Sequence, residues 1–215
     1  MKSSIKINEI FYSIQGESTF AGLPCVFIRL TGCNLRCNYC DTTYALEEGE
    51  KMTLDEIIAK VNSFPCQLVE ITGGEPLLQW ESYDLANRLR SMKKQVLIET
   101  NGSFDISVLR EPIVRIMDFK CPSSGEAKKM NWNNIQHLRP GDNVKFVIAN
   151  RQDFDWSVEV VKKYDLLTQC EVLFSAVFAE LELKELANWL LETALPIRLQ
   201  LQLHKYVWRR NRRGV

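Results

Sequence analysis

The stretch Cys25-Val-Phe-Ile-Arg-Leu-Thr-Gly-Cys-Asn-Leu-Arg-Cys-Asn-Tyr-Cys-Asp-Thr-Thr43 joins an apolar segment to a loop rich in cysteine. The apolar part, Cys25–Leu30, is typical of a buried strand. The loop that follows places Cys33, Cys37 and Cys40 in a C-x3-C-x2-C spacing. Thiolates bind zinc and iron–sulfur iron, but a structural zinc site takes four ligands, commonly from paired half-sites. Because no second cysteine pair follows, the loop favours a four-iron cluster with one open iron over a zinc site or buried thiols.

A second apolar segment, Leu68–Thr72, runs directly into the turn Gly73-Gly-Glu-Pro76. Glycine lets a backbone approach a ligand closely, and Pro76 favours an extended conformation of Glu75. A strand that ends in such a turn can present carbonyl groups and a carboxylate to a cation. The alternative interpretation is an ordinary strand-to-helix turn, which this motif alone does not exclude.

The remaining apolar segments recur at intervals that predict an alternation of strands and helices. Further strands are expected at Ile5–Ile14, Val96–Thr100, Ile113–Phe119, Asn143–Ile148, Glu171–Ser175 and Ile197–Leu203. Helices are expected from a capping box at Thr53 to Val61, over Leu77–Met92, near Trp156–Tyr164 and over Leu183–Thr193. The last of these helices carries an apolar stripe that predicts a core-facing side, made of Leu183, Leu186, Ala187, Leu190 and Leu191.

This alternation predicts an α/β fold of parallel strands joined by right-handed crossovers. The glycine and polar motifs stand at the carboxyl ends of strands, which is where barrel-like α/β folds carry their active sites. Roughly six repeats are too few for a closed eight-stranded barrel, so we expect an incomplete TIM-like barrel with helices outside. Ordinary globular composition and a length of 215 residues predict a single domain over residues 1–215.

Charge and cysteine usage narrow the class of protein. Lys+Arg and Asp+Glu each number 27, so the chain has no global attraction for nucleic acid or an anionic membrane. Lys2 and Lys6 are not followed by a signal-like apolar run, and no run approaches the ~20 residues of a membrane span. An odd count of seven cysteines then indicates a reducing cytoplasm and metal ligation. The isolated Cys25, Cys66, Cys121 and Cys170 are expected to be buried apolar residues.

Other polar residues have two interpretations each. Gln15-Gly-Glu-Ser18 is either a polar surface turn, which the sequence alone favours, or a binding site in which the Gln15 side chain hydrogen-bonds to the edge of a heterocycle. Arg29, inside a buried strand, is expected to form a structural ion pair or to bind a substrate carboxylate. His204 follows an alternating segment and is a structural or an active-site histidine, whereas His137 is expected at the surface.

The combination of C-x3-C-x2-C, an aromatic Tyr39 before the last cysteine, and Gly73-Gly-Glu-Pro76 resembles the radical S-adenosylmethionine (SAM) superfamily. Further motifs narrow the resemblance to the family of 7-carboxy-7-deazaguanine synthases, over nearly the whole chain. Those motifs are Phe11-Tyr-Ser-Ile-Gln-Gly-Glu17, Cys40-Asp-Thr42, Ile71–Pro76, Glu99-Thr-Asn-Gly102, Asp118-Phe-Lys-Cys-Pro-Ser-Ser-Gly125 and Leu203-His-Lys-Tyr206.

The resemblance implies an enzyme of queuosine and 7-deazapurine biosynthesis that uses a [4Fe–4S] cluster, SAM and Mg²⁺. The implied reaction contracts the ring of 6-carboxy-5,6,7,8-tetrahydropterin to 7-carboxy-7-deazaguanine and releases ammonia. It implies that a 5'-deoxyadenosyl radical takes the hydrogen, so no protein side chain is assigned as the catalytic group. It further implies a homodimer and an electron donor such as flavodoxin.

The resemblance also implies roles residue by residue. The cluster ligands are Cys33, Cys37 and Cys40, and Thr42 binds Mg²⁺. The SAM site is lined by Tyr39, Gly74, Glu75, Glu99, Lys120 and Ser123. The pterin site is lined by Ile14, Gln15, Gly16, Arg29, Thr72 and His204.

Two other functions stay open at this point. One is another radical SAM enzyme, such as a glycyl-radical activating enzyme, which binds a folded protein partner. The other is a non-catalytic iron–sulfur protein, which needs a fourth protein ligand to its cluster. The Arg-rich tail Trp208–Arg213 departs from relatives that end sooner with a carboxylate near the substrate, and it is expected to be a solvated end.

Overall fold

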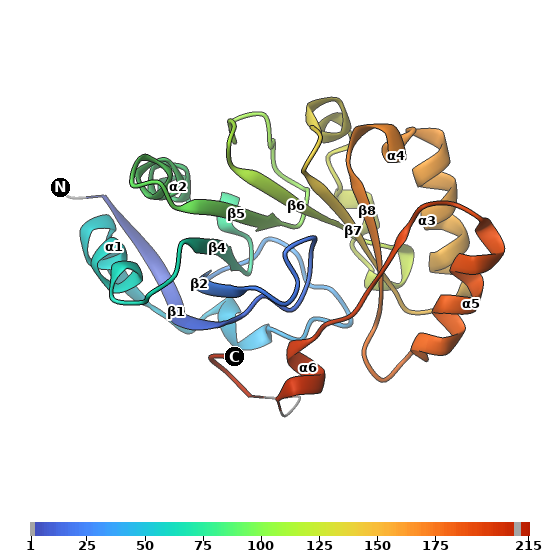
Figure 1. The fold of residues 1–215 in the computed structure, drawn as a ribbon, viewed down its shortest axis with the longest axis horizontal. Coiled ribbons are helices and arrows are strands. Elements are labelled where there is room, and N and C mark those ends of the chain that lie inside the picture. Colours follow the sequence, from blue (N-terminus) through green and yellow to red (C-terminus); the bar gives the residue numbers. More distant parts are fainter. Residues whose placement is uncertain (1–2, 209–211) are drawn as a thin grey trace.

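The computed structural model describes residues 3–208 and 212–215. The described part forms a nine-stranded sheet in the order β3-β1-β2-β4-β5-β6-β7-β8-β9, which is open because β3 and β9 form its two edges (Figure 1). The strands are β1 (Ser4–Ile14), β2 (Pro24–Leu30), β3 (Glu50–Thr53), β4 (Leu68–Gly73), β5 (Gln95–Thr100), β6 (Val114–Phe119), β7 (Asn143–Ile148), β8 (Glu171–Ala176) and β9 (Arg198–Gln200).

Helices lie around the outside of the curved sheet (Figure 1). They are α1 (Leu54–Asn62), α2 (Glu81–Ser91), α3 (Arg151–Lys163), α4 (Leu166–Gln169), α5 (Leu183–Thr193) and α6 (His204–Val207). Short 3-10 helices are η1 (Thr43–Leu46), η2 (Pro76–Leu78), η3 (Pro122–Ser124), η4 (Ala127–Lys129) and η5 (Trp132–His137). No helix in the described ranges is both long enough and apolar enough to cross a membrane.

The predicted α/β partial barrel is confirmed. Strands β2 and β4 to β9 pair in parallel with their neighbours. The sequence did not predict the other edge, where β1 pairs antiparallel with both β2 and β3. The reason is local, because a hairpin loop over residues 15–23 joins β1 to β2 without room for a crossover helix.

Local sequence explains where several elements begin. The predicted capping box is present, since Thr53 accepts from the amide of Glu56 and the Glu56 carboxylate accepts from the amide of Thr53. Helix α3 begins at Arg151, earlier than predicted, because the Asn150 side chain caps it by accepting from the amide of Asp153.

Three sequence predictions are corrected. The helix expected over Leu77–Met92 begins only at Glu81, because Pro76 first starts the separate turn η2. Strand β9 covers only Arg198–Gln200, with buried Gln200 and exposed Leu199, so the expected apolar face over residues 197–203 is wrong. In α5, Leu186 and Leu190 are buried as expected, but Leu191 is 80% exposed.

The two faces of the sheet differ in chemistry, because alternate side chains point to opposite sides. The face toward the helices carries the main apolar core, which includes Ile28, Ile71 and Ile98. The inner face carries a small apolar cluster, including Phe27 and Leu97, near the amino ends of the strands. Toward the carboxyl ends the inner face becomes polar: Arg29 on β2 is paired with Thr72 on β4, Asp118 on β6 is paired with Lys145 on β7, and Glu99 lies near the end of β5.

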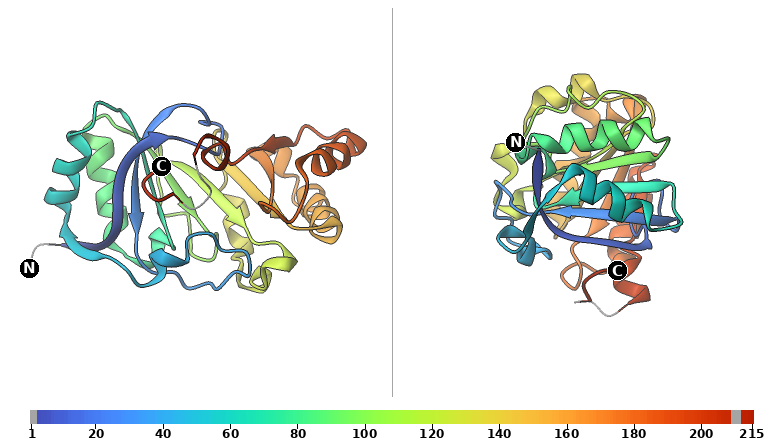
Figure 2. Two further views of the ribbon diagram at one scale, coloured as in Figure 1. Left: turned by 90° about the horizontal axis from the view of Figure 1, so that it is seen from below. Right: turned by 90° about the vertical axis from the view of Figure 1, so that its left-hand side faces the viewer.

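The C-terminal segment returns to the N-terminal part of the fold (Figure 2). The amide of Leu203 donates to the carbonyl of Gly16 at 2.9 Å. This contact takes residues 201–203 out of the sheet, which explains why β9 is shorter than predicted.

Candidate active site at the carboxyl ends of the strands

The turn after β4 packs against the start of the cysteine loop. The amide of Glu75 donates to the carbonyl of Gly32 at 2.8 Å, and that of Gly74 donates to Leu30 at 3.3 Å. A Cβ on Gly74 would lie 2.1 Å from the Gly32 oxygen, and one on Gly73 would lie 2.3 Å from the Leu30 oxygen. Both glycines are therefore required for the backbone of this turn to support the cysteine loop.

Glu75 ties this turn to the end of β5. Its carboxylate is fully buried and accepts from the amide of Leu77 at 2.9 Å, the hydroxyl of Thr100 at 2.8 Å and the amide of Asn101 at 2.7 Å. Burial raises the pKa of Glu75 to about 7, although these hydrogen bonds oppose the shift. All these partners belong to the protein, so a contact of Glu75 with SAM stays a prediction.

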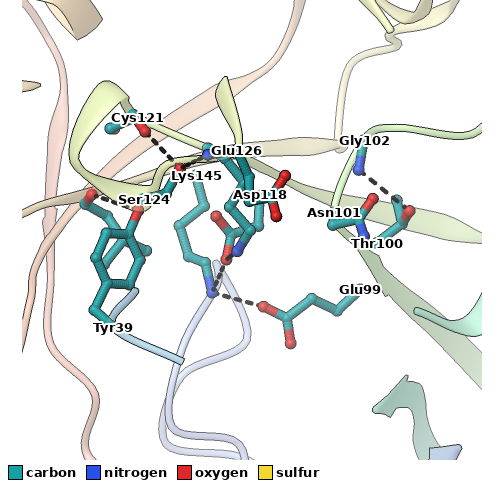
Figure 3. Close-up of polar contacts among 12 residues, drawn as sticks. Tyr39, Glu99, Thr100, Asn101, Gly102, Asp118, Cys121, Ser124, Glu126 and Lys145 are labelled. Atoms are coloured by element: carbon teal, nitrogen blue, oxygen red, sulfur yellow. Dashed lines mark hydrogen bonds and ion pairs between the residues drawn. The ribbon is translucent and has the colours of Figure 1, made fainter. Parts of the chain in front are cut away.

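The cysteine loop is fastened to the loops that follow β6 and β7. The amide of Arg36 donates to Glu126 at 2.7 Å, and that of Asn38 donates to the carbonyl of Ser124 at 3.0 Å. The Tyr39 hydroxyl donates to the carbonyl of Val147 at 3.4 Å. The loop therefore extends across the carboxyl ends of several strands (Figure 3).

The three thiols of this loop lie close enough to influence one another. Cys33 and Cys37 are half-buried and Cys40 is exposed. Burial raises the pKa of Cys37 to about 11; Lys120 opposes this shift, and Cys40 and Cys33 add to it. In the described ranges, no three His, Cys, Asp or Glu side chains already form a closed metal site. Three soft donors on one loop nevertheless match the donor set of a cluster that leaves one iron open.

The other four cysteines belong to other parts of the fold. Cys25 and Cys121 are fully buried as predicted, and the Cys121 thiol lies 3.4 Å from the hydroxyl of Ser157 in α3. Cys66 and Cys170 are only partly buried, which corrects the prediction for these two. Both flank the amino ends of strands, beside Leu68 and Glu171, at the edge opposite the cysteine loop.

The loop between β1 and β2 crosses the inner face of the sheet. Gln15 and Ser18 are 3% and 2% exposed, so the interpretation as a polar surface turn is wrong. The amide of Thr19 donates to the Asn143 side chain of β7 at 2.9 Å. This hairpin loop therefore spans the open barrel and places its polar residues on the inner face of the sheet.

The Gln15 amide is held in one orientation by two protein groups. Its Nε2 donates to the buried carboxyl of Glu70, and its Oε1 accepts from the amide of Glu17 at 2.5 Å. Burial, together with the nearby Glu99 and Glu17, raises the pKa of Glu70 well above its ordinary value. Contact between the pterin and Gln15 stays a prediction. It would have to use the second N–H of Nε2 or the second lone pair of Oε1, because the protein contacts occupy the others.

A buried lysine joins three carboxylates on the inner face. Lys145 Nζ lies 2.6 Å from Glu99, 2.8 Å from Glu17 and 3.3 Å from Asp118, and the side chain is 4% exposed (Figure 3). We call these four residues the Lys145 cluster. Lys120, a predicted SAM-site residue, adds a second ammonium 3.0 Å from Asp118.

The Lys145 cluster also contacts Thr72, a predicted pterin residue, and it lowers the pKa of Glu17. The Thr72 hydroxyl donates to Glu99 at 3.1 Å. Burial alone would raise the pKa of Glu17, but Lys145 and then His204 outweigh burial and lower it to about 2. Sequence reasoning missed Lys145, although a charge inside an apolar strand is the same signal that singled out Arg29.

Arg29 has a structural partner. Its Nε donates to Glu9 on β1 at 2.8 Å, and both side chains are less than one-fifth exposed, at 17% and 18%. The Tyr44 hydroxyl donates to the same carboxylate at 3.0 Å. The structure therefore contains the ion-pair alternative for Arg29, while its contact with a substrate carboxylate stays a prediction.

Helix α6 closes one side of the site. A Cβ on Gly16 would lie 2.4 Å from His204 Nδ1, so this glycine permits close packing of the histidine on the hairpin loop. Lys205 Nζ lies 2.5 Å from the carboxylate of Asp41, whose other oxygen accepts from Thr42 at 2.9 Å. Helix α6 is thereby fastened to the cysteine loop beside Thr42, the predicted Mg²⁺ ligand.

Two more predicted residues lie at the margins. Ile14 ends β1 opposite Pro24, directly before Gln15. Ser123 accepts from Asn150 at 2.9 Å through its hydroxyl and from the Asn38 side chain at 3.0 Å through its carbonyl. Most of the predicted residues thus lie toward the carboxyl edge of the parallel strands, whereas Ile14 lies at the amino edge because β1 runs antiparallel to β2. Part of the Arg-rich tail, Arg209–Asn211, lies outside the described residues.

Comparisons with known proteins agree with this arrangement. The model of the Radical SAM superfamily matches residues 27–123. The 7-carboxy-7-deazaguanine synthase of Chlorobaculum tepidum is 43% identical over 100% of this chain and 99% of its own length. That of Koribacter versatilis is 42% identical over 98% of this chain and 100% of its own length.

The fold has a close counterpart among solved structures. The crystal structure of QueE from Escherichia coli has a TM-score of 0.74 and 20% identity, covering 91% of this chain and 92% of that chain. At this identity the likeness supports the fold, and the two full-length relatives establish the family. The chain with the three-cysteine loop, the glycine turn and the polar inner face therefore belongs to the 7-carboxy-7-deazaguanine synthase family of the radical SAM superfamily.

Proposed function

We propose that this chain catalyses the ring contraction of 6-carboxy-5,6,7,8-tetrahydropterin to 7-carboxy-7-deazaguanine, with loss of ammonia, in queuosine and 7-deazapurine biosynthesis. The observation that carries this proposal is the full-length 43% identity to a 7-carboxy-7-deazaguanine synthase. Placement of the three-cysteine loop beside a polar inner face supports it. When bound, the cluster and SAM supply the radical chemistry, and the protein binds, orients and shields the reactants.

Cys33, Cys37 and Cys40 hold the cluster in this proposal, and the SAM site lies beside them. Gly74 contributes backbone next to the cysteine loop, while Tyr39 and Ser123 approach from the loop itself and from η3. The buried Cys121 faces α3, so it does not offer a fourth ligand. A donor set of three thiols leaves room for SAM at the open iron.

The pterin binds on the inner face, between the hairpin loop and the ends of β4 and β5. A pterin carries N–H donors and, in this substrate, a carboxylate. Glu17 and the predicted Gln15 supply acceptors for the donors, and Arg29 supplies a cation for the carboxylate. Glu99 stays with the SAM site. His204 lies against Gly16 and limits the access of water from the side of α6.

Mg²⁺ binds at the Thr42 hydroxyl in this proposal. Mg²⁺ prefers oxygen ligands and keeps several of its waters, so one protein hydroxyl plus substrate oxygens is a suitable set. The neighbouring Asp41 carboxylate adds local negative charge. Removal of Mg²⁺ by a chelator should therefore weaken pterin binding.

The remaining features of the proposal concern the protein as a whole. A sheet that runs through the described ranges supports one domain over residues 1–215. Its open edges, β3 and β9, support a homodimer in which a second copy covers an edge. The free thiols support a cytoplasmic location and a cytoplasmic reductant such as flavodoxin.

The test is anaerobic turnover of the reconstituted protein. Reductant, SAM, Mg²⁺ and 6-carboxytetrahydropterin are added, each is omitted in turn, and 7-carboxy-7-deazaguanine is sought by mass. Product that depends on every component supports the proposal. Cleavage of SAM without this product would indicate that the chain catalyses a different radical SAM reaction. An intact cluster without any cleavage of SAM would refute the proposal that the chain is a radical SAM enzyme.

A further inference from the structure

Lys145 occupies an unusual position in the sheet. It lies in the middle of β7, between Val144 and Phe146, which are both fully buried on the helix side. Its own side chain points to the inner face and is 4% exposed. A buried ammonium needs compensation, and this one receives it from Glu17 in the hairpin loop, Glu99 on β5 and Asp118 on β6.

We propose that Lys145 is a positioning residue of the active site, which fixes Glu17 as an ionised hydrogen-bond acceptor for the N–H groups of the pterin and holds Glu99 in place beside it. This inference rests on the proposed function and names a residue that neither the sequence motifs nor the family resemblance assigned.

The charge balance argues against a purely structural role. Three carboxylates face Lys145, and Lys120 adds one more ammonium, so the acids exceed the cations by one. A stability device needs no such surplus, because an unpaired buried charge is costly. The surplus is compensated when a ligand brings N–H donors to the free lone pairs of these carboxylates.

The three carboxylates around Lys145 favour a fixed ammonium over a proton donor in the reaction. Although burial opposes it, three carboxylates raise the pKa of Lys145 well above its ordinary value, so the ammonium keeps its proton. It therefore acts as a fixed cation that aligns two segments distant in sequence, residues 15–23 and the end of β5.

Every element around the Lys145 cluster contributes charged or titratable groups. Besides the cluster itself these are Glu70 on β4, Lys120 after β6, His204 on α6 and Asp41 in the cysteine loop. Burial lowers the pKa of His204, and among the cations His204 ranks after Lys145 in lowering the pKa of Glu17. Lys145 is consequently the main cation that holds Glu17 ionised.

Removal of this cation changes the hydrogen-bonding character of the site. In Lys145→Met the largest opposition to burial at Glu17 is lost, so the pKa of Glu17 rises from about 2. A protonated Glu17 donates where the pterin needs an acceptor. Pterin binding should then weaken at low pH and recover as pH rises, whereas Lys145→Arg retains the positive charge.

The experiment measures pterin affinity directly, by anaerobic calorimetry on the reconstituted enzyme, together with kcat and KM between pH 6 and pH 8. At pH 6 we expect Lys145→Met to bind the tetrahydropterin at least about 10-fold more weakly than the wild type. Relative to wild type, its affinity should improve about 10-fold between pH 6 and pH 8, and Lys145→Arg should restore most of the loss.

The matched control is Arg115→Met. Arg115 is a buried cation on the neighbouring strand, and its removal takes the nearest cation from a buried carboxylate, that of Asp142, which keeps only Arg139 at 3.7 Å. It should destabilise the fold without changing the pH dependence of pterin binding. Thermal unfolding of each variant identifies protein that fails to fold.

The outcomes separate this inference from the proposed function. A wild type that binds and converts no pterin refutes the proposed function, whatever Lys145 does. A wild type that turns over, with Lys145→Met or Lys145→Arg showing wild-type pH dependence and affinity, overturns the inference. Equal shifts of the pH dependence in Lys145→Met and Arg115→Met would also overturn it, because they would indicate a general effect of lost stability.

Discussion

Two buried cations on neighbouring strands, Arg115 on β6 and Lys145 on β7, have very different surroundings. Arg115 meets a single acid, Asp142, with Nε donating at 2.8 Å and both side chains almost fully buried. Its guanidinium also donates to the carbonyls of Ile106 and His137. Asp142 in turn accepts from the amides of Arg115 and Arg139. Arg139 Nε lies 3.7 Å from the same carboxylate, so this acid does not exceed its cations, and neighbouring backbone groups supply further hydrogen bonds.

Lys145 meets three acids that come from three separate segments, and its cluster retains a surplus of negative charge. The Arg115 pair fastens the loop before β7 near the amino edge of the sheet, at the end opposite the cysteine loop. The Lys145 cluster lies toward the carboxyl edge, beside the cysteine loop. The difference indicates that a balanced buried pair stabilises this fold, whereas an unbalanced cluster is prepared for a ligand.

The largest expected effect tests whether the carboxyl edge is the reactive edge at all. Cys37→Ala removes one of three cluster ligands and should abolish both iron–sulfur binding and product formation. Iron content, visible absorbance and turnover measure this. Cys170→Ala, at the opposite edge, is the control and should keep cluster and activity. A Cys37→Ala protein with full iron and turnover would refute the cluster assignment.

Arg115→Met tests the balanced side of the comparison. Its removal takes away the nearest and most buried cation of Asp142 and leaves only Arg139 at 3.7 Å, so the free energy of unfolding should fall by up to about 3–5 kcal/mol. Turnover per folded molecule should stay near that of the wild type. Urea unfolding and activity assays provide the two values. The exposed Arg151→Met, which loses surface pairs with Asp155 and Glu192, should change stability far less than Arg115→Met does.

Glu75 sharpens the comparison, because it is a buried carboxyl with hydrogen bonds but no ion pair. Its pKa of about 7 in the fold exceeds the ordinary 4.5, so the folded state holds an extra proton between these values. Stability from this group is therefore full below pH 4.5 and is lost as pH rises to 7, by about 3 kcal/mol in total. Urea unfolding from pH 5 to pH 8 should show this fall, and Glu75→Gln should flatten it. An unchanged slope in Glu75→Gln would assign the proton to another group.

The smallest expected effect concerns Arg29. Its ion pair with Glu9 resembles the Arg115–Asp142 pair, whereas its position on the inner face resembles that of the Lys145 cluster. Arg29→Ala should weaken pterin binding by about 10- to 100-fold and leave reductive cleavage of SAM intact. Glu9→Gln breaks the same ion pair but keeps the guanidinium, so it serves as the matched control. If both variants lose pterin affinity equally, Arg29 acts only through the ion pair.

The sequence was most informative where chemistry and local structure coincide. The spacing of Cys33, Cys37 and Cys40, and the turn after β4, predicted the location of the site because both follow apolar strands directly. The partial barrel followed from strand and helix alternation. Strand β7 was predicted with its observed ends, Asn143 and Ile148.

The sequence was least informative where a contact joins distant segments. Nothing local shows that Glu17 reaches Lys145, because the hairpin loop must first cross the inner face of the sheet. The short β9 depends on the contact of Leu203 with Gly16, which overrides an alternating pattern. Glu75 stands in a motif associated with ligand binding, yet its carboxylate is used to hold the end of β5.

The most direct test of the central claim is turnover with a tetrahydropterin that carries deuterium on its reduced ring. If the pterin lies on the inner face beside SAM, deuterium should enter the recovered SAM pool, and 7-carboxy-7-deazaguanine should exceed 5'-deoxyadenosine. Stoichiometric 5'-deoxyadenosine without deuterium and without this product would contradict the claim, because the radical would then be reacting away from the pterin.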